Sequence, residues 1–280
     1  MHKIAILSDI HGNLTALEAV LADASKEKAT EYWVLGDYLM PGPGSSEILR
    51  ILQKLPNITF VSGNWDDFFL LSPTTDFSNP TKLYGARLAM YQHQQLKEVD
   101  LTFMKELPEF AKKEVHDLKF LITHHLPHQK YGGDLRPNGD QDDFDSLFSE
   151  HIADVAIYGH THHQLMRYSS SGQIIINPGA VCLSFFHWEK HRSSLNRAQY
   201  TLLEVDENGI GNICFKKIPY DIKKELTLAT ARNLPYLELY KDAMETGRSY
   251  THNHEVLKRI NDEQDILNEV MTYFNRGDNQ

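Results

Sequence analysis

Cysteine is scarce in this sequence, and long apolar runs are missing. Cys182 and Cys214 are the only cysteines among 280 residues, which argues against a disulfide framework, a zinc ribbon or a redox motif. No apolar stretch approaches the roughly 18–20 residues that a membrane-spanning helix needs. An apolar run begins at Lys3, which leaves no room for a signal peptide at this N-terminus. We therefore expect a cytoplasmic protein with reduced thiols and no membrane contact.

Positive charge is also in deficit, since 28 Lys and Arg face 38 Asp and Glu and the net charge is −10. This balance argues against a protein that binds nucleic-acid polymers or membrane surfaces in general. Hydrophobic residues make up 41% of the chain, enough for a sizeable core. The length permits one large α/β domain or one domain with an appendage. The unusual feature is histidine, with 15 residues.

Short apolar runs alternate with helical periodicity along most of the chain. The runs that predict strands are 3–7, 31–35, 58–62, 119–123, 153–158 and 174–176. Two later runs, 200–205 and 213–218, flank a turn and predict an antiparallel hairpin. From residue 221 to about residue 274 the pattern is amphipathic and helical. The last third alternates less regularly than the first, so we expect an α/β protein with two sheets.

Polar side chains follow five of the predicted strands. They are Asp9 with His11, Asp37, Asn64, His124, and His160 with His162. In open α/β sheets, ligands bind at the edge where strands end. Side chains two residues apart on an extended segment point the same way, so Asp9 and His11 can converge on one ion. These strand ends therefore predict a common site.

The types of ligand indicate the chemistry of that site. Carboxylates, imidazoles and an amide oxygen, without thiolate, suit manganese, iron, cobalt, nickel or zinc. Seven potential ligands are too many for one tetrahedral zinc but fit two ions that share a carboxylate. Asp37 is the natural bridge, because it is the lone carboxylate on its strand end. Two ions about 3.5–4 Å apart can activate a bridging water and clamp the oxygens of an in-line phosphoryl displacement.

These residues resemble, in order and spacing, the five blocks of the calcineurin-like metallophosphoesterases. The blocks are Asp9-Ile10-His11-Gly12-Asn13, Gly36-Asp37, Gly63-Asn64, Thr123-His124 and Gly159-His160-Thr161-His162. Asn177-Pro178-Gly179 resembles a further block of the compact bacterial and archaeal phosphodiesterase branch. The resemblance covers roughly residues 3 to 219. It implies a four-layer αββα sandwich of two mixed sheets flanked by helices. We expect a metallophosphoesterase domain over 1–220 and a C-terminal helical extension over 221–280, packed on or beside the core.

The resemblance also implies a ligand set and an activity. One metal would be held by Asp9, His11, Asp37 and His162. The second would be held by Asp37, Asn64, His124 and His160. The two ions are expected to be manganese or iron, with zinc as an alternative. The implied function is hydrolysis of a small phosphodiester or phosphomonoester by in-line attack of a metal-bridging hydroxide, with Asp37 and Asn64 at the catalytic centre.

Two departures from the family pattern leave questions open. Many members carry histidine after the Gly-Asn block to protonate the leaving group, whereas this chain has Trp65. We take His125 as the candidate proton donor, with His163 or His191 as alternatives. The arginine that the protein-phosphatase branch places shortly after that block is absent before Arg87, which argues against a protein phosphatase.

Several features have a plainer reading that competes with a functional one. Asp66 and Asp67 are expected to cap a helix, with contact to the site as the alternative. The basic segment 185–197 is expected to be solvated, with binding of substrate phosphate as the alternative. The C-terminal helices offer a surface for homo-oligomer formation. A non-catalytic, metal-bound interaction scaffold is the alternative function, but the complete ligand set favours an enzyme.

Overall fold

Two five-stranded sheets form the centre of the molecule. The computed structural model describes residues 1–184 and 197–277. The first sheet has the order β10 (Gly209–Pro219), β9 (Arg197–Asp206), β1 (His2–Leu7), β2 (Glu31–Val34) and β3 (Ile58–Phe60). The second has the order β4 (Phe110–Val115), β5 (Leu118–Thr123), β6 (Val155–Ile157), β8 (Ile174–Pro178) and β7 (Gln164–Tyr168). Both sheets are mixed, since β1 pairs parallel with β2 and antiparallel with β9, and β8 pairs parallel with β6 and antiparallel with β7.

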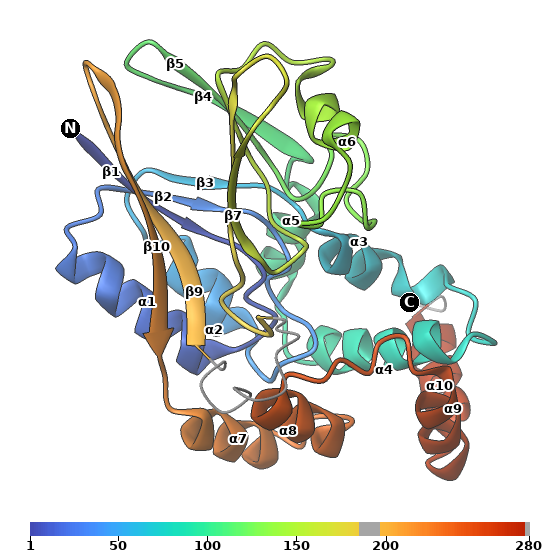
Figure 1. Ribbon diagram of the computed structural model, residues 1–280. Coiled ribbons are helices and arrows are strands. Elements are labelled where there is room, and N and C mark those ends of the chain that lie inside the picture. The colour runs from blue at the N-terminus through green and yellow to red at the C-terminus, as the bar shows by residue number, and fades with distance from the viewer. Residues whose placement is uncertain (185–196, 278–280) are drawn as a thin grey trace.

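Helices cover the outer faces of both sheets (Figure 1). The helices before the hairpin are α1 (Leu14–Lys26), α2 (Ser46–Leu52), α3 (Asn64–Leu71), α4 (Pro80–His93), α5 (Glu98–Lys105) and α6 (Gln141–Asp145). Those after it are α7 (Ile222–Ala231), α8 (Leu237–Thr246), α9 (His254–Glu263) and α10 (Ile266–Gly277). Helix α6 lies against the second sheet, α1 lies against the first, and α9 and α10 pack against α4. This arrangement confirms the predicted αββα sandwich.

Alternating apolar side chains explain why the sheets pack on both faces. Ile4 and Ile6 of β1 point into the layer between the sheets. Ala5 and Leu7 of the same strand point into the layer under the helices. All four are fully buried. Because both faces of the central strands are covered, these strands read as continuous apolar runs in the sequence.

Two edge strands were not predicted from the sequence. Strands β4 and β7 lie at opposite edges of the second sheet, and their side chains are mostly half-buried or exposed. Lys112 and Lys113 on β4 are typical of an edge strand that avoids pairing with another chain. Their low burial removes the apolar pattern by which the other strands were identified.

The sequence predicts two helix starts, one capped by Asn13 and one capped by Asp100. Asn13 does cap α1, because its Oδ1 accepts a hydrogen bond from Ala16 N–H at 2.9 Å. Asp100 lies inside α5 instead, where its Oδ2 accepts from Lys97 N–H at 3.0 Å. A carboxylate at this third helical position stabilises a helix start from within.

The C-terminal helices share the main core. Ala229 of α7 and Met244 of α8 are buried in the same cluster as α1 and the first sheet. Leu257 of α9 is fully buried in that cluster, while Ile266 and Val270 of α10 pack with residues of α4. The division into two domains at residue 220 stays a prediction, with that residue between β10 and α7. Among the described residues, no helix is long and apolar enough to span a bilayer.

Candidate metal centre

The loops at the carboxyl ends of five strands meet at one place between the two sheets. Asp9 and His11 follow β1, Asp37 follows β2, and Asn64 begins α3 after β3. The second sheet contributes His124 after β5, and His160 with His162 after β6. Each sheet therefore supplies part of the site, and their face-to-face packing brings the parts together. Gly63 allows the Asp37 side chain to approach the second loop closely, because a Cβ on Gly63 would lie 2.1 Å from Asp37 Oδ1.

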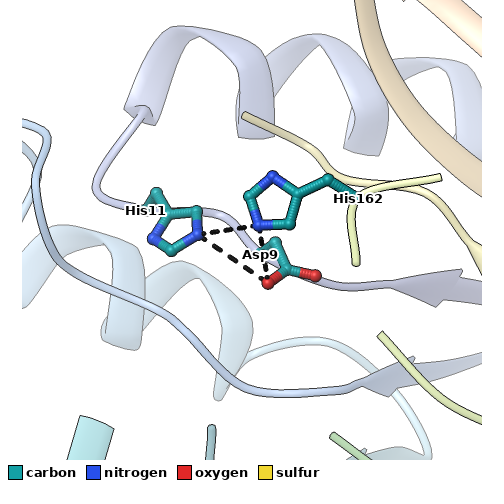
Figure 2. A group of neighbouring side chains, drawn as sticks. All are labelled: Asp9, His11 and His162. Atoms are coloured by element: carbon teal, nitrogen blue, oxygen red, sulfur yellow. Dashed lines mark hydrogen bonds and ion pairs between the residues drawn. The ribbon is translucent and has the colours of Figure 1, made fainter. Parts of the chain in front are cut away.

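Asp9, His11 and His162 form one half of the centre (Figure 2). His162 Nε2 lies 3.1 Å from Asp9 Oδ1 and 3.2 Å from His11 Nε2. His11 Nε2 lies 3.7 Å from the same Asp9 oxygen. Three potential ligand atoms from two sheets therefore point at one small volume.

His124, Asn64 and His160 form the other half. His124 Nε2 lies 3.1 Å and His160 Nδ1 lies 2.8 Å from Asn64 Oδ1. Asp37 Oδ2 lies 3.5 Å from His124 Nε2 and 3.8 Å from His11 Nε2. The Asp37 carboxylate therefore faces both halves, as a bridging ligand must. Asp9 Oδ1 also approaches His124 Nε2, at 4.0 Å.

Backbone carbonyls orient three of the imidazoles. The Nδ1 atoms of His11, His124 and His162 lie 2.5, 2.5 and 2.6 Å from carbonyl oxygens of residues 40, 35 and 183. An Nδ1–H that donates to a carbonyl leaves the Nε2 lone pair facing the centre, which is the tautomer a metal ligand needs. Asp9 Oδ1 is buried and faces the Nε2 atoms of His162, His11 and His124. Converging lone pairs around such an oxygen fit divalent cations.

The charges of the centre favour the same conclusion. Burial opposes ionisation of Asp9, but the His162, His124 and His11 imidazoles outweigh it and hold the pKa of Asp9 far below its ordinary value. Burial also opposes protonation of His124, but Asp37 and Asp9 raise the pKa of that imidazole to about 10. The buried carboxylates of Asp9 and Asp37 are therefore stabilised by positive charge, which protonated imidazoles supply when no metal is bound.

The backbone at the centre is unusual. Five of the candidate ligands have φ values between 50° and 61°, in the left-handed region: Asp9, His11, Asp37, His160 and His162. Each such residue other than glycine costs about 1–3 kcal/mol, and such residues cluster at functional sites. The strand-end pattern in the sequence gave no sign of this conformation.

The candidate proton donors lie at the side of the centre. His125 is buried, its Nδ1 lies 3.0 Å from Gln129 O, and its ring centroid lies 5.0 Å from that of His160. Burial lowers the pKa of His125 to about 4, so this imidazole is neutral at neutral pH and its role as acid stays a prediction. His163 Nδ1 contacts Thr161 O. His191 and the basic segment lie outside the described residues, except Arg197 at the start of β9.

Trp65 stands beside the first half of the centre. Its ring contacts His11 edge to face, with centroids 6.0 Å apart. Its backbone N–H donates to Asp37 Oδ1 at 2.8 Å. Trp65 therefore contacts candidate ligands through both its side chain and its backbone.

Two buried polar residues support the loops. Asp66 was expected to cap a helix, with contact to the site as the alternative, and it does both. At the helix start it accepts a hydrogen bond from Gly63 N–H at 2.8 Å. It also accepts from Asp37 N–H and Tyr38 N–H at 2.7 and 3.1 Å. Asn177 donates to Gly159 O and Thr161 Oγ1, at 2.7 and 3.1 Å, on the loop of His160 and His162. Two sequence features could have indicated these supporting roles. One is the acidic residue two positions after Asn64, and the other is the Asn-Pro-Gly block.

Several known proteins are similar to this chain in sequence or fold. An uncharacterised protein of Methanocaldococcus jannaschii is 27% identical over 243 residues, which cover 83% of this chain and 93% of that protein. A phosphodiesterase of the same archaeon is 24% identical over 181 residues, 64% of this chain and 84% of the relative. The crystal structure of a metallophosphoesterase from Sphaerobacter thermophilus matches with a TM-score of 0.66 and 25% identity, covering 88% of this chain and all of that one.

A sequence model of the calcineurin-like phosphoesterase superfamily domain matches residues 2–208. The matched region contains all seven candidate ligands and both sheets apart from β10. Since the match spans well over half of the chain, the protein belongs to the calcineurin-like phosphoesterase superfamily.

Proposed function

We propose that this protein is a two-metal phosphoesterase that hydrolyses a small phosphodiester or phosphomonoester. The observation that carries the proposal is the convergence of carboxylate, imidazole and amide ligand atoms from five loops, with Asp37 Oδ2 within 3.8 Å of an imidazole in each half. When bound, two divalent ions would supply Lewis-acid stabilisation of phosphate charge and an activated water. Manganese or iron suits this ligand set best, and zinc is the alternative.

The protein's own groups would hold and orient these ions. We assign Asp9, His11, Asp37 and His162 to the first ion. We assign Asp37, Asn64, His124 and His160 to the second. The carbonyls that accept from His11, His124 and His162 fix each ring in the ligating tautomer. Burial of Asp9 and Asp37 keeps water away from the carboxylates, so their attraction for cations is weakly screened.

The leaving group determines which esters would be good substrates. Trp65 has no proton to transfer at neutral pH, and His125 is neutral there because its pKa is about 4. Esters whose leaving oxygen is a stable anion, such as aryl esters, are therefore the preferred class. Diesters carry less negative charge than monoesters and face less repulsion from the buried carboxylates. The similarity to an archaeal phosphodiesterase agrees with this preference.

The test is metal-dependent turnover. Purified protein is stripped with a chelator and reloaded with Mn²⁺, Fe²⁺ or Zn²⁺, then assayed with an aryl phosphodiester and the matching aryl phosphomonoester. We expect two ions per chain, activity that returns with metal, and faster turnover of the diester. Metal binding without turnover of either ester would favour the interaction scaffold instead.

The free Cys182 and Cys214 are compatible with the proposed cytoplasmic location.

A further inference from the structure

Glu225, on the C-terminal helix α7, is a fully buried carboxylate outside the metal centre. Its Oε2 accepts a hydrogen bond from Thr15 N–H at 3.1 Å, and its Oε1 accepts from Tyr240 O–H at 3.1 Å. Burial raises the pKa of this carboxyl above its ordinary value. Since burying a carboxylate costs free energy, its hydrogen-bond partners must offset that cost.

The Glu225 carboxylate stabilises the start of α1 through Thr15. It lies in the first turn of α1, directly after the loop that carries Asp9 and His11. The first N–H groups of a helix lack partners within the helix, and negative charge is favourable there. Asn13 Oδ1 accepts a hydrogen bond from Ala16 N–H, and Glu225 Oε2 accepts one from Thr15 N–H. The helix start is therefore held once from within and once by a residue 210 positions away.

The other contacts of the C-terminal helices act on the same region. Asn13 Nδ2 lies 3.3 Å from Tyr220 Oη and 3.6 Å from Met244 Sδ. Arg232 Nη1 donates to Pro43 O at 3.0 Å, and the neighbouring Gly42 N–H donates to His11 O at 2.8 Å. The C-terminal helices thus hold the chain on both sides of the His11 loop.

We propose that Glu225 is a positioning residue of the metal centre, through which the C-terminal helices fix the Asp9–Asn13 loop and set the affinity for the first ion. The inference rests on the proposed function, because it requires a metal at Asp9 and His11. It goes beyond the family match, which ends at residue 208. It makes the helices after residue 220 part of what builds the site.

The experiment compares three variants by calorimetric titration of chelator-stripped protein with Mn²⁺ and by the metal dependence of turnover. Glu225→Met keeps the length of the side chain but accepts no hydrogen bond. Glu225→Gln keeps an oxygen for Thr15 N–H and can donate to Tyr240 Oη. Leu257→Ala, at a fully buried position of α9, is the control, because α9 packs against α4 and α10 and the change destabilises the C-terminal helices there. Circular dichroism establishes that each variant is folded at the assay temperature.

We expect Glu225→Met to weaken one Mn²⁺ site about tenfold, with turnover recovered at excess Mn²⁺, as for other residues that orient metal ligands indirectly. Glu225→Gln should stay within about threefold of wild type, and Leu257→Ala should bind Mn²⁺ normally. Unchanged affinity in Glu225→Met, or equal weakening in Leu257→Ala, would overturn the inference. If Glu225→Met does not fold, Tyr240→Phe removes one partner of Glu225, and unchanged Mn²⁺ affinity there would overturn it too. Wild-type protein that binds no metal would instead refute the proposed function.

Discussion

Asp66 offers the sharpest test of how the metal centre is held together. Its carboxylate is 2% exposed. Oδ2 accepts from Asp37 N–H at 2.7 Å and Gly63 N–H at 2.8 Å, and Oδ1 accepts from Tyr38 N–H at 3.1 Å. One side chain therefore joins the loop of the proposed bridging ligand to the turn that presents Asn64. We predict that Asp66→Asn damages both stability and activity.

The magnitude follows from the three hydrogen bonds. An asparagine can keep its oxygen on Asp37 and Gly63, but its NH₂ group then faces Tyr38 N–H. A buried N–H without an acceptor costs about 1–3 kcal/mol, and bonds to a neutral acceptor are weaker than bonds to a carboxylate. Burial and the nearby Asp37 carboxylate raise the pKa of Asp66 to about 7. Removing the charge of Asp66 therefore relieves an unfavourable interaction and offsets part of the loss in stability. We expect a net loss of about 2 kcal/mol in the free energy of unfolding.

The expected loss of activity is larger than the loss of stability suggests. A displacement of about 1 Å at a catalytic group can cost about 10²-fold in rate, so we expect turnover to fall roughly 10- to 100-fold at saturating Mn²⁺. The assay is urea denaturation together with hydrolysis of an aryl phosphodiester.

Asp67→Asn is the matched control. Its side chain is 41% exposed and pairs with Lys130 at 2.7 Å, an interaction worth less than about 1 kcal/mol. If Asp66→Asn and Asp67→Asn had the same stability and turnover, the three hydrogen bonds would not hold the centre, and the reasoning would be refuted.

The remaining predictions concern the ions and the proton donor. Asp37→Asn should cost more activity than loss of any single terminal ligand, with an unchanged circular dichroism spectrum; near-normal turnover would exclude the bridging role. Because the pKa of His124 is raised to about 10 without metal, Mn²⁺ must displace a proton from this imidazole at neutral pH. The affinity of the protein for Mn²⁺ should therefore rise about tenfold per pH unit between pH 6 and 9. A calorimetric affinity that does not change with pH would contradict this prediction. Rates for aryl esters should fall steeply as the leaving-group pKa rises, equally in wild type and His125→Ala; a shallow wild-type slope that steepens in the variant would make His125 the acid. Leu267 and Met271 are 43% and 44% exposed on α10. Lys substitutions at these two positions should weaken any self-association measured by sedimentation. An unchanged association constant would exclude this surface as the contact between copies.

Local patterns in the sequence were sufficient for an α/β protein with two sheets and for the set of candidate ligands, whereas the four-layer sandwich was implied by the family resemblance. Continuous apolar runs such as 3–7 and 153–158 predicted buried strands because these strands are covered on both faces. Asp9, His11 and Asp37 stood at the ends of such runs, and strand ends in α/β sheets share an edge. The edge strands β4 and β7 escaped notice because half-exposed strands carry little apolar pattern.

Contacts between distant parts of the chain required the folded structure. Nothing in the spacing of residues shows that Glu225 reaches Thr15 or that Asp66 reaches Asp37 and Tyr38. Such partners are chosen by packing of helices and loops, which depends on the whole core. The left-handed backbone at Asp9 and His11 has the same origin. It is unfavourable locally and persists because the surrounding sheets and helices hold it.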